Sequence, residues 1–334
     1  MSEPILKVRG LKTYFFLEEG VVKAVDGVDL DIKKGEILGL VGETGSGKSV
    51  TALSIIRLIQ SPPGKIVGGA VIFEGEDLLK KKKEEMRKIR GAKISMIFQD
   101  PHTSLDPVFT IGSQIAEPIL LHQVEEQHLM RAEEVPKKVI EMLKLVRIPD
   151  VEQRVVEYPH QFSGGMKQRA MIAMMLSCNP SLLIADEPTT AIDVTIQAQI
   201  LNLIRDLRRK LGTAVLLITH NLGVVAEMCD RVAVMYAGNI VEQAEIMTLF
   251  KSPKHPYTKA LLAAVPKVGA KKRKLETIRG MVPSLITPPP GCKFHPRCPR
   301  VMDICKKEFP QMIEIGKGNF VRCHLYSKGS GGVA

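Results

Sequence analysis

The feature that most constrains the fold is the glycine-rich stretch Gly42-Glu43-Thr44-Gly45-Ser46-Gly47-Lys48-Ser49, which lies between an apolar run and a helical pattern. Residues 37–41 predict a buried strand and residues 48–60 predict a helix. A strand, a glycine loop and a helix in this order form the P-loop arrangement, in which backbone N–H groups and the helix N-terminus bind phosphate. A chance match of a Gly/Ser-rich loop is the competing explanation, and the flanking elements argue against it. The sequence therefore predicts that Lys48 reaches the β and γ phosphates of a nucleotide and that Ser49 ligates Mg²⁺.

A second motif follows a wholly apolar run later in the chain. Residues 182–185 read Leu-Leu-Ile-Ala and are followed by Asp186 and Glu187. Helical patterns at 165–176 and 194–211 flank this run, and buried strands that alternate with helices predict a parallel sheet whose carboxyl edge carries the two acids. An apolar strand ending in two acids is common by itself. Beside a P-loop it predicts that Asp186 holds Mg²⁺ through water and that Glu187 polarises the attacking water.

The length of 334 residues predicts one large domain with an appendage. We interpret residues 1–250 as an α/β nucleotide-binding domain with an antiparallel edge sheet. From about 101 to 165 the pattern becomes helical, which indicates an inserted helical subdomain. Residues 251–334 form a C-terminal extension that contains a small cysteine module at about 288–326, entered through a proline-rich joint.

Composition narrows the partners and the compartment. The formal net charge of +11 favours anionic partners without choosing among nucleotides, lipid surfaces and nucleic acid. Trp is absent and aromatic residues are 4%, which argues weakly against base stacking on nucleic acid. We find no run of about 18 apolar residues and no signal-peptide pattern, so we expect a cytoplasmic protein that does not span a bilayer. Its cysteines are then read as thiols or metal ligands before disulfides.

The stretch Phe162-Ser163-Gly164-Gly165-Met166-Lys167-Gln168-Arg169 is a second candidate for binding phosphate, because Ser163 can cap a helix and the glycines let backbone approach an anion. By itself Ser-Gly-Gly could also be an ordinary loop-to-helix turn. The stretch closely resembles the signature motif of ABC-type ATPases, and other landmarks of that family follow over about residues 5–250. They are Gln99 of the Q-loop, Ala191-Ile192-Asp193 of the D-loop, the switch histidine His220, and Phe15, or Tyr14, as the aromatic residue that stacks on adenine.

The resemblance implies that the ligand is ATP with Mg²⁺. It implies catalytic roles for Glu187, His220 and Gln99, and ligation of Mg²⁺ by Ser49, Gln99 and Asp186. In this family two such domains pack head to tail, so that the P-loop of one and the signature of the other bind the same ATP. The residues implied to bind the nucleotide are Phe15, Gly42, Glu43, Thr44, Gly45, Ser46, Gly47, Lys48, Ser49, Val50, Gln99, Ser163, Gly164, Gly165, Asp186, Asp193 and His220.

Four of the six cysteines lie near the end of the chain, at Cys292, Cys298, Cys305 and Cys323. Four thiolates can hold a tetrahedral zinc ion or a 4Fe–4S cluster. The gaps of five, six and seventeen residues match neither the close pairs of a zinc ribbon nor the compact ferredoxin pattern, so spacing leaves the metal open. Unlinked thiols or two disulfides are the alternatives without a metal.

The stretch 291–299, with Cys305 and Cys323, resembles the C-terminal extension of peptide-importer ATPases. The signature reading Ser-Gly-Gly-Met resembles the same family, in its D-type subunit. In that family the cysteines hold a 4Fe–4S cluster, so the resemblance favours iron–sulfur in a structural or regulatory role, with zinc as the weaker alternative. The function implied is ATP hydrolysis that drives import of dipeptides or oligopeptides.

The resemblance also implies partners. They are a second, related ATPase in a heterodimer, two transmembrane permease subunits whose coupling helices contact residues 100–119, and indirectly a substrate-binding protein. The chain is expected at the cytoplasmic face of the plasma membrane, without a nucleic-acid partner. The alternatives are a soluble ABC-type ATPase acting on nucleic acid or ribosomes, and a redox sensor in which the cluster gates the ATPase. The cargo stays open, since relatives carry peptides, nickel or oligosaccharides.

Overall fold

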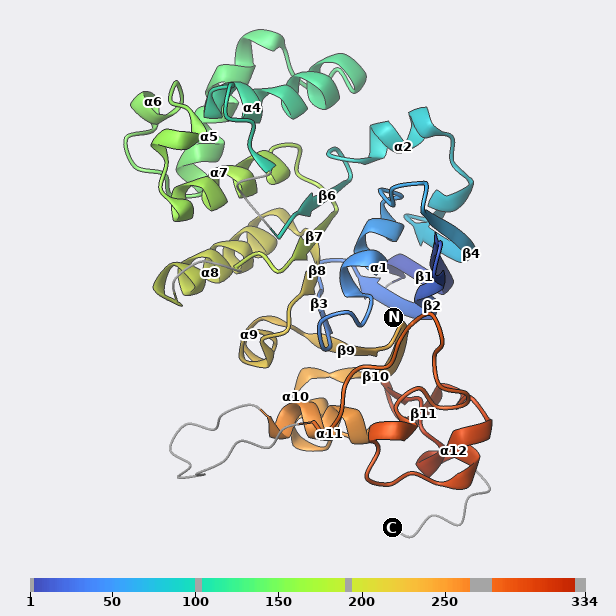
Figure 1. Ribbon diagram of the computed structural model, residues 1–334. Coiled ribbons are helices and arrows are strands. Elements are labelled where there is room, and N and C mark those ends of the chain that lie inside the picture. The colour runs from blue at the N-terminus through green and yellow to red at the C-terminus, as the bar shows by residue number, and fades with distance from the viewer. Residues whose placement is uncertain (1–2, 100–103, 190–193, 265–277, 328–334) are drawn as a thin grey trace. The chain divides into compact units, whose positions relative to one another are not determined.

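The computed structural model describes residues 3–99, 104–189, 194–264 and 278–327 (Figure 1). The described residues separate into two compact units, each assembled from distant parts of the chain. The helical unit takes its residues from 1–5, 32–36 and 80–217. The P-loop unit takes its residues from 6–31, 37–79 and 218–334. This division is distinct from the domain boundaries expected from the sequence, which stay a prediction.

The P-loop unit contains two sheets. The first has the strand order β2–β1–β4–β5, and in it β1 and β4 run antiparallel, with Leu6 opposite Phe73 and Phe15 opposite Gly64. The second contains the strand order β11–β12–β10–β9–β3, in which β3 and β9 are parallel and the other neighbours are antiparallel. The strands are β1 Pro4–Leu17, β2 Gly20–Lys33, β3 Ile37–Val41, β4 Gly64–Phe73, β5 Glu76–Asp77, β9 Arg231–Tyr236, β10 Asn239–Glu245, β11 Ile313–Gly316 and β12 Asn319–Val321.

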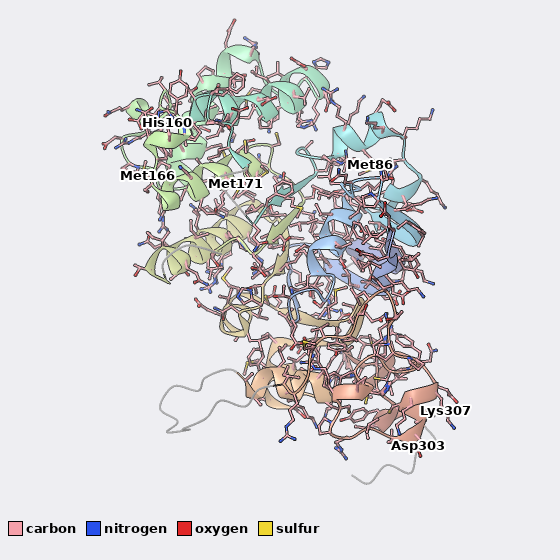
Figure 2. The ribbon with its side chains drawn as sticks, viewed as in Figure 1. Met86, His160, Met166, Met171, Asp303 and Lys307 are labelled. Carbon is pink, nitrogen blue, oxygen red and sulfur yellow. The ribbon has the colours of Figure 1, made fainter. Side chains whose placement is uncertain are left out.

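Short helices accompany these sheets. Helix α1 is the next element after β3 and packs on β1, where the Ser54 and Thr13 hydroxyl oxygens lie 2.7 Å apart. Helix α9 begins at the cap Asn221, whose side-chain oxygen accepts hydrogen bonds from Gly223 N and Val224 N. Figure 2 labels Asp303 and Lys307, both exposed, at the two ends of α12. The helices of this unit are α1 Lys48–Ile55, α9 Leu222–Met228, α10 Ile246–Lys251, α11 Pro256–Ala263 and α12 Asp303–Lys307, with 3-10 turns at His295–Arg297 and His324–Tyr326.

The helical unit combines three strands with a group of helices. Its strands follow the order β8–β7–β6, with β6 and β7 parallel, and every residue of β7 and β8 is buried because both faces are covered. Its elements are α2 Lys83–Ile89, β6 Ile94–Ile97, α4 Ile111–Pro118, a π-helical stretch Ile119–Glu126, α5 Val135–Leu145, α6 Val151–Arg154, α7 Gly164–Leu176, β7 Leu182–Asp186, α8 Val194–Leu211 and β8 Ala214–Ile218. Met166 and Met171 mark α7 in Figure 2.

The predicted elements that bear on the site are confirmed, with differences in extent. Strand 37–41 and helix 194–211 have the expected bounds. The helix after the P-loop ends at residue 55 rather than 60. None of the helices in the described part of the chain is long and apolar enough to cross a membrane.

Candidate nucleotide site

The P-loop connects β3 to α1 in the P-loop unit, and its glycines are required by the backbone. Gly45 and Gly47 have φ values of +79° and +103°, a region that other residues rarely adopt. A Cβ at Gly42 would overlap the carbonyl oxygen of Met235, and a Cβ at Gly47 would overlap that of Ala24. The loop is therefore pressed against β9 and β2, and only glycine fits at these two positions.

Lys48 lies along the inside of this loop. It is buried, and its Nζ donates hydrogen bonds to Gly42 O at 2.8 Å and Glu43 O at 3.1 Å. Ser46 is fixed from two sides, since its N–H donates to Glu43 O and its carbonyl accepts from Gly238 N at 2.9 Å. Within the described residues its buried hydroxyl oxygen has no hydrogen-bond partner. A buried ammonium, a free hydroxyl and glycine N–H groups at a helix N-terminus fit the phosphates of a nucleotide.

His220 lies in the same unit, in the loop from β8 to α9, and its side chain is exposed. The preceding Thr219 donates its N–H to Leu40 O in β3 at 3.4 Å, and Asn221 N donates to the Thr219 hydroxyl at 3.0 Å. The loop of His220 therefore starts beside the strand that leads into the P-loop.

Phe15 and Tyr14 lie on β1, and the structure gives them different surroundings. Phe15 is half-buried opposite Gly64, where an added Cβ would come within 2.9 Å of its ring. The Tyr14 hydroxyl donates to Asp26 Oδ1 at 2.8 Å. Burial, together with this hydrogen bond, raises the pKa of Tyr14 to about 12. Tyr14 is thus committed to Asp26, which leaves Phe15 as the better candidate for adenine.

The helical unit carries the acid pair and the Q-loop glutamine. Asp186 ends β7 and is buried, and Glu187 follows with φ +47°, a conformation uncommon for a residue with a side chain. Gln99 Nε2 donates to Glu187 Oε2 at 3.4 Å. The structure thus brings together two of the three residues expected to be catalytic. Strained backbone of this kind is frequent at functional sites.

The signature segment is in the same unit and begins α7. The Ser163 hydroxyl caps the helix by accepting from Met166 N at 3.4 Å, as predicted. Ser163 and Gly164 are exposed, so their backbone is accessible from outside this unit. A Cβ at Gly165 would come within 2.9 Å of Ile196 in α8, so close helix packing requires a glycine there.

Gln168 is a residue of this site that the sequence did not single out, although it lies inside the signature stretch. It is buried on α7, and its Nε2 donates to Pro188 O at 2.6 Å. Pro188 follows Glu187, so Gln168 ties the signature helix to the acid pair. A glutamine in a helical pattern gives no sign of such a contact. The predicted D-loop residues 191–193, including Asp193, lie outside the described residues, as do 100–103 of the expected coupling segment.

The four C-terminal cysteines lie in the P-loop unit, and all six cysteines of the chain are free thiols, so the alternative of two disulfides is wrong. Burial raises the pKa of Cys292 to about 11 and that of Cys323 to about 12, and neighbouring cysteines add to the increase. Within the described residues, no group of three or more His, Cys, Asp or Glu side chains is arranged to hold a metal ion. The described residues therefore show no preformed site for the predicted 4Fe–4S cluster or its zinc alternative.

Comparison with known proteins gives two family matches. Residues 25–190 match the ABC transporter family, and residues 241–305 match the C-terminal region of oligopeptide and dipeptide transporters. The chain is 55% identical to the probable peptide ABC transporter ATP-binding protein y4tR of Sinorhizobium fredii, over 96% of this chain and 95% of the relative. It is 51% identical to the oligopeptide transport ATP-binding protein AppD of Bacillus subtilis, over 97% of both chains. The dipeptide transport ATP-binding protein DppD of Bacillus subtilis is 48% identical, over 97% of this chain and 95% of that protein.

Among solved structures, the chain is similar to the dimeric ATP-binding cassette MJ0796 in a post-hydrolysis state with ADP and phosphate. The TM-score is 0.64 at 28% identity, with 72% of this chain and 98% of that chain covered. The fold and the P-loop define an α/β P-loop ATPase with a mixed sheet and a helical subdomain, as predicted. The chain belongs to the ABC transporter family and is one of its ATP-binding, ATP-hydrolysing proteins. Membership implies that it acts with membrane permease subunits, which favours the transporter interpretation over the nucleic-acid alternative.

Proposed function

We propose that this chain uses ATP hydrolysis to drive the import of dipeptides or oligopeptides. The observation that carries this proposal is that one chain contains both a P-loop with two obligatory glycines and a peptide-transporter C-terminal region. The chain matches AppD and DppD over nearly the full lengths of both proteins, and the names of these relatives support a peptide cargo. The domain boundaries 1–250 and 251–334, with a helical subdomain at about 101–165 and a cysteine module at about 288–326, are part of the proposal.

The residues of the P-loop unit would bind the triphosphate. Lys48 would leave the carbonyl oxygens of Gly42 and Glu43, which it now contacts, and pair with the β and γ phosphates. Ser46, Gly45 and Gly47 would donate to phosphate oxygens, and Phe15 would stack on adenine. His220 would hydrogen-bond the γ-phosphate, in the loop that starts beside β3. The remaining residues Thr44, Ser49 and Val50 would complete the loop that surrounds the phosphates.

The residues of the helical unit would carry the chemistry. Glu187 would orient and polarise the attacking water, held in place by Gln99. Mg²⁺, ligated by Ser49, Gln99 and Asp186, would neutralise charge on the phosphates. The signature residues Ser163, Gly164 and Gly165 would contact the ATP of a partner subunit. Their exposure at the N-terminus of α7 supports this role.

We propose a head-to-tail nucleotide-sandwich dimer with a second, related ATPase. The dimeric MJ0796 cassette supports the arrangement, and the choice of a heterodimer rests on the resemblance alone. This pair would sit at the cytoplasmic face of the plasma membrane under two permease subunits, with a substrate-binding protein on the other side. Exposed Val108 and Phe109, before α4, are suitable contacts for the permeases.

The test of the catalytic assignment is Glu187→Gln. Turnover should fall by at least about a hundredfold, because the polarising carboxylate is lost, while the affinity for ATP stays within about threefold. Steady-state phosphate release and equilibrium binding of a fluorescent ATP analogue measure the two. Glu141→Gln, which removes an exposed carboxylate from α5, is the matched control and should leave both unchanged. Undiminished hydrolysis in the Glu187 variant would reject the role.

We also propose an iron–sulfur cluster on the four C-terminal cysteines, as the resemblance implies. The structural observation in its favour is that Cys292 N donates to Cys305 O at 2.8 Å, which holds two of the four cysteines side by side. When bound, the cluster would cross-link the segments of the module. Protein purified without oxygen should contain about four iron atoms and matching sulfide per chain. Cys298→Ser should lose the iron and Cys178→Ser should keep it; wild-type protein that holds no iron, even after reconstitution, would reject the cluster.

A further inference from the structure

The C-terminal extension reaches the P-loop through one arginine. The Arg297 guanidinium donates two parallel hydrogen bonds to the Glu43 carboxylate, Nη1 to Oε2 at 2.6 Å and Nη2 to Oε1 at 3.0 Å. This is the bidentate geometry in which an arginine holds a carboxylate most firmly. The Arg297 side chain is only 5% exposed and that of Glu43 is 25% exposed, so water screens the pair little.

The other donors of Arg297 are also engaged. Its Nε donates to Arg279 O at 2.9 Å, and Nη1 contacts the Tyr236 hydroxyl at 3.4 Å. The guanidinium lies 5.8 Å from the centre of the Tyr236 ring. These contacts orient the Arg297 guanidinium toward Glu43.

Glu43 transmits this constraint to the phosphate-binding groups. Its N–H donates to the buried Tyr257 hydroxyl at 2.9 Å, and its carbonyl oxygen accepts from Lys48 Nζ and from Ser46 N. The side chain, the N–H and the carbonyl group of Glu43 are thus held by three different parts of the P-loop unit. The position of Glu43 sets the positions of Lys48 and Ser46.

A second basic residue of the same segment contacts the backbone that supports the loop. Lys293 Nζ donates to Ala237 O at 3.0 Å and to Asp26 Oδ2 at 3.1 Å. Ala237 precedes Gly238, whose N–H donates to Ser46 O. Between the two basic residues, Phe294 is buried and packs edge-on against Tyr236, with ring centres 5.2 Å apart.

Glu43 is an unexpected residue in this place. A loop that binds the polyanionic phosphates of ATP gains from every positive charge and loses from every negative charge close to it. An uncompensated carboxylate at Glu43 would repel the triphosphate. Arg297 cancels that charge and holds the carboxylate in one orientation.

We infer that Arg297 is a positioning residue of the nucleotide site, and that the segment 292–298 makes the C-terminal extension a working part of that site. Arg297 compensates the charge of Glu43 and thereby sets the loop for phosphate. The inference rests on the proposed binding of ATP by the P-loop. It requires no contact between the extension and the nucleotide itself.

The experiment compares four versions of the full-length chain: wild type, Arg297→Gln, Glu43→Gln and the double variant. Arg297→Gln should raise the Kd for Mg-ATP about tenfold, because the Glu43 charge is exposed to the phosphates, and should raise that for Mg-ADP less. The double variant should return to within about threefold of wild type, since the harmful charge is gone. Thermal unfolding of each variant is recorded beside the affinities.

Arg300→Gln is the matched control, because Arg300 is an exposed arginine of the same module, and its affinity should not change. A Kd for Arg297→Gln equal to wild type, or a double variant that binds as weakly as Arg297→Gln, would overturn the inference. If Arg297→Gln does not fold, the double variant decides: near-normal binding supports charge compensation, and lost binding rejects it. Lys48→Ala, measured in parallel, separates this result from the P-loop assignment, which fails only if that variant still binds ATP normally.

Discussion

At the scale of single residues, His255 shows how a titratable group can serve as a neutral structural element. Its side chain is buried at the start of α11, where Nδ1 accepts a hydrogen bond from Tyr257 N at 3.0 Å and caps the helix. A nitrogen that accepts must be unprotonated, and burial lowers the pKa of His255 from 6.5 to about 3. The neutral imidazole also packs near Phe294 of the C-terminal extension, with ring centres 5.7 Å apart.

We therefore expect acid to destabilise the protein through His255. In the unfolded chain this histidine takes up a proton near pH 6.5, whereas in the folded chain it does so only near pH 3. The stability that the neutral form contributes is complete above about pH 6.5 and is lost as the pH falls toward 3, at about 1.4 kcal/mol per pH unit. The melting temperature should drop by about 1 to 2 °C between pH 6.5 and 5.5 from this group.

Thermal unfolding of wild type and His255→Gln across pH 7.5 to 5 measures the effect. Glutamine can still accept the cap hydrogen bond but does not titrate, so its curve should be flatter in this range. His160→Gln, at an exposed position, should keep the wild-type slope. Parallel curves for wild type and His255→Gln would contradict the prediction.

At the scale of elements, the segment that enters α4 presents apolar side chains outward. Val108 is 70% exposed and Phe109 is 55% exposed. Ile111 N donates to Glu157 O at 2.8 Å, which places the segment that follows α6 beside the start of α4. Val156 in that segment is 67% exposed. Apolar side chains gathered in this way on one unit mark an interaction surface.

Phe109→Asp tests this surface as the contact for the permeases. A charge there should prevent docking in an apolar interface, so peptide uptake in reconstituted vesicles should fall at least about tenfold. The ATPase rate of the isolated subunit should stay within about twofold, because Phe109 is an exposed residue outside the proposed catalytic set. Met247→Asp, on α10 of the P-loop unit, is a control with 59% exposure that should keep uptake. Normal uptake by the Phe109 variant would remove this surface from the proposal.

Elements were predictable where one signal dominated. Strands 37–41 and 214–218 are wholly apolar and buried on both faces, and α8 shows a clear helical pattern, so their bounds follow from the sequence. Strands β9 and β10 were not predicted, although a hairpin turn with positive φ at Ala237 and Gly238 joins them. The reason lies in β10, where Glu242 and Gln243 are buried and break the apolar pattern expected of an interior strand.

At the scale of the whole molecule, some parts of the candidate site can be predicted from the sequence and others cannot. The P-loop and the acid pair are each a short continuous stretch of sequence. Their residue types and the elements that flank them identify both. The contact of Arg297 with Glu43 joins residues 254 positions apart, and neither residue type signals the other. The ligand set of the C-terminal cysteines depends on side-chain placement within an irregular module, which spacing does not determine.

The distance along the chain between Glu43 and its counter-ion also has a consequence for biosynthesis. During synthesis the phosphate-binding loop emerges from the ribosome 254 residues before the arginine that neutralises it. Until then the growing polypeptide carries an acidic group in the position that ATP must approach. If Arg297 compensates the charge of Glu43 as proposed, a nascent chain that does not yet contain Arg297 should bind nucleotide more weakly than the full chain.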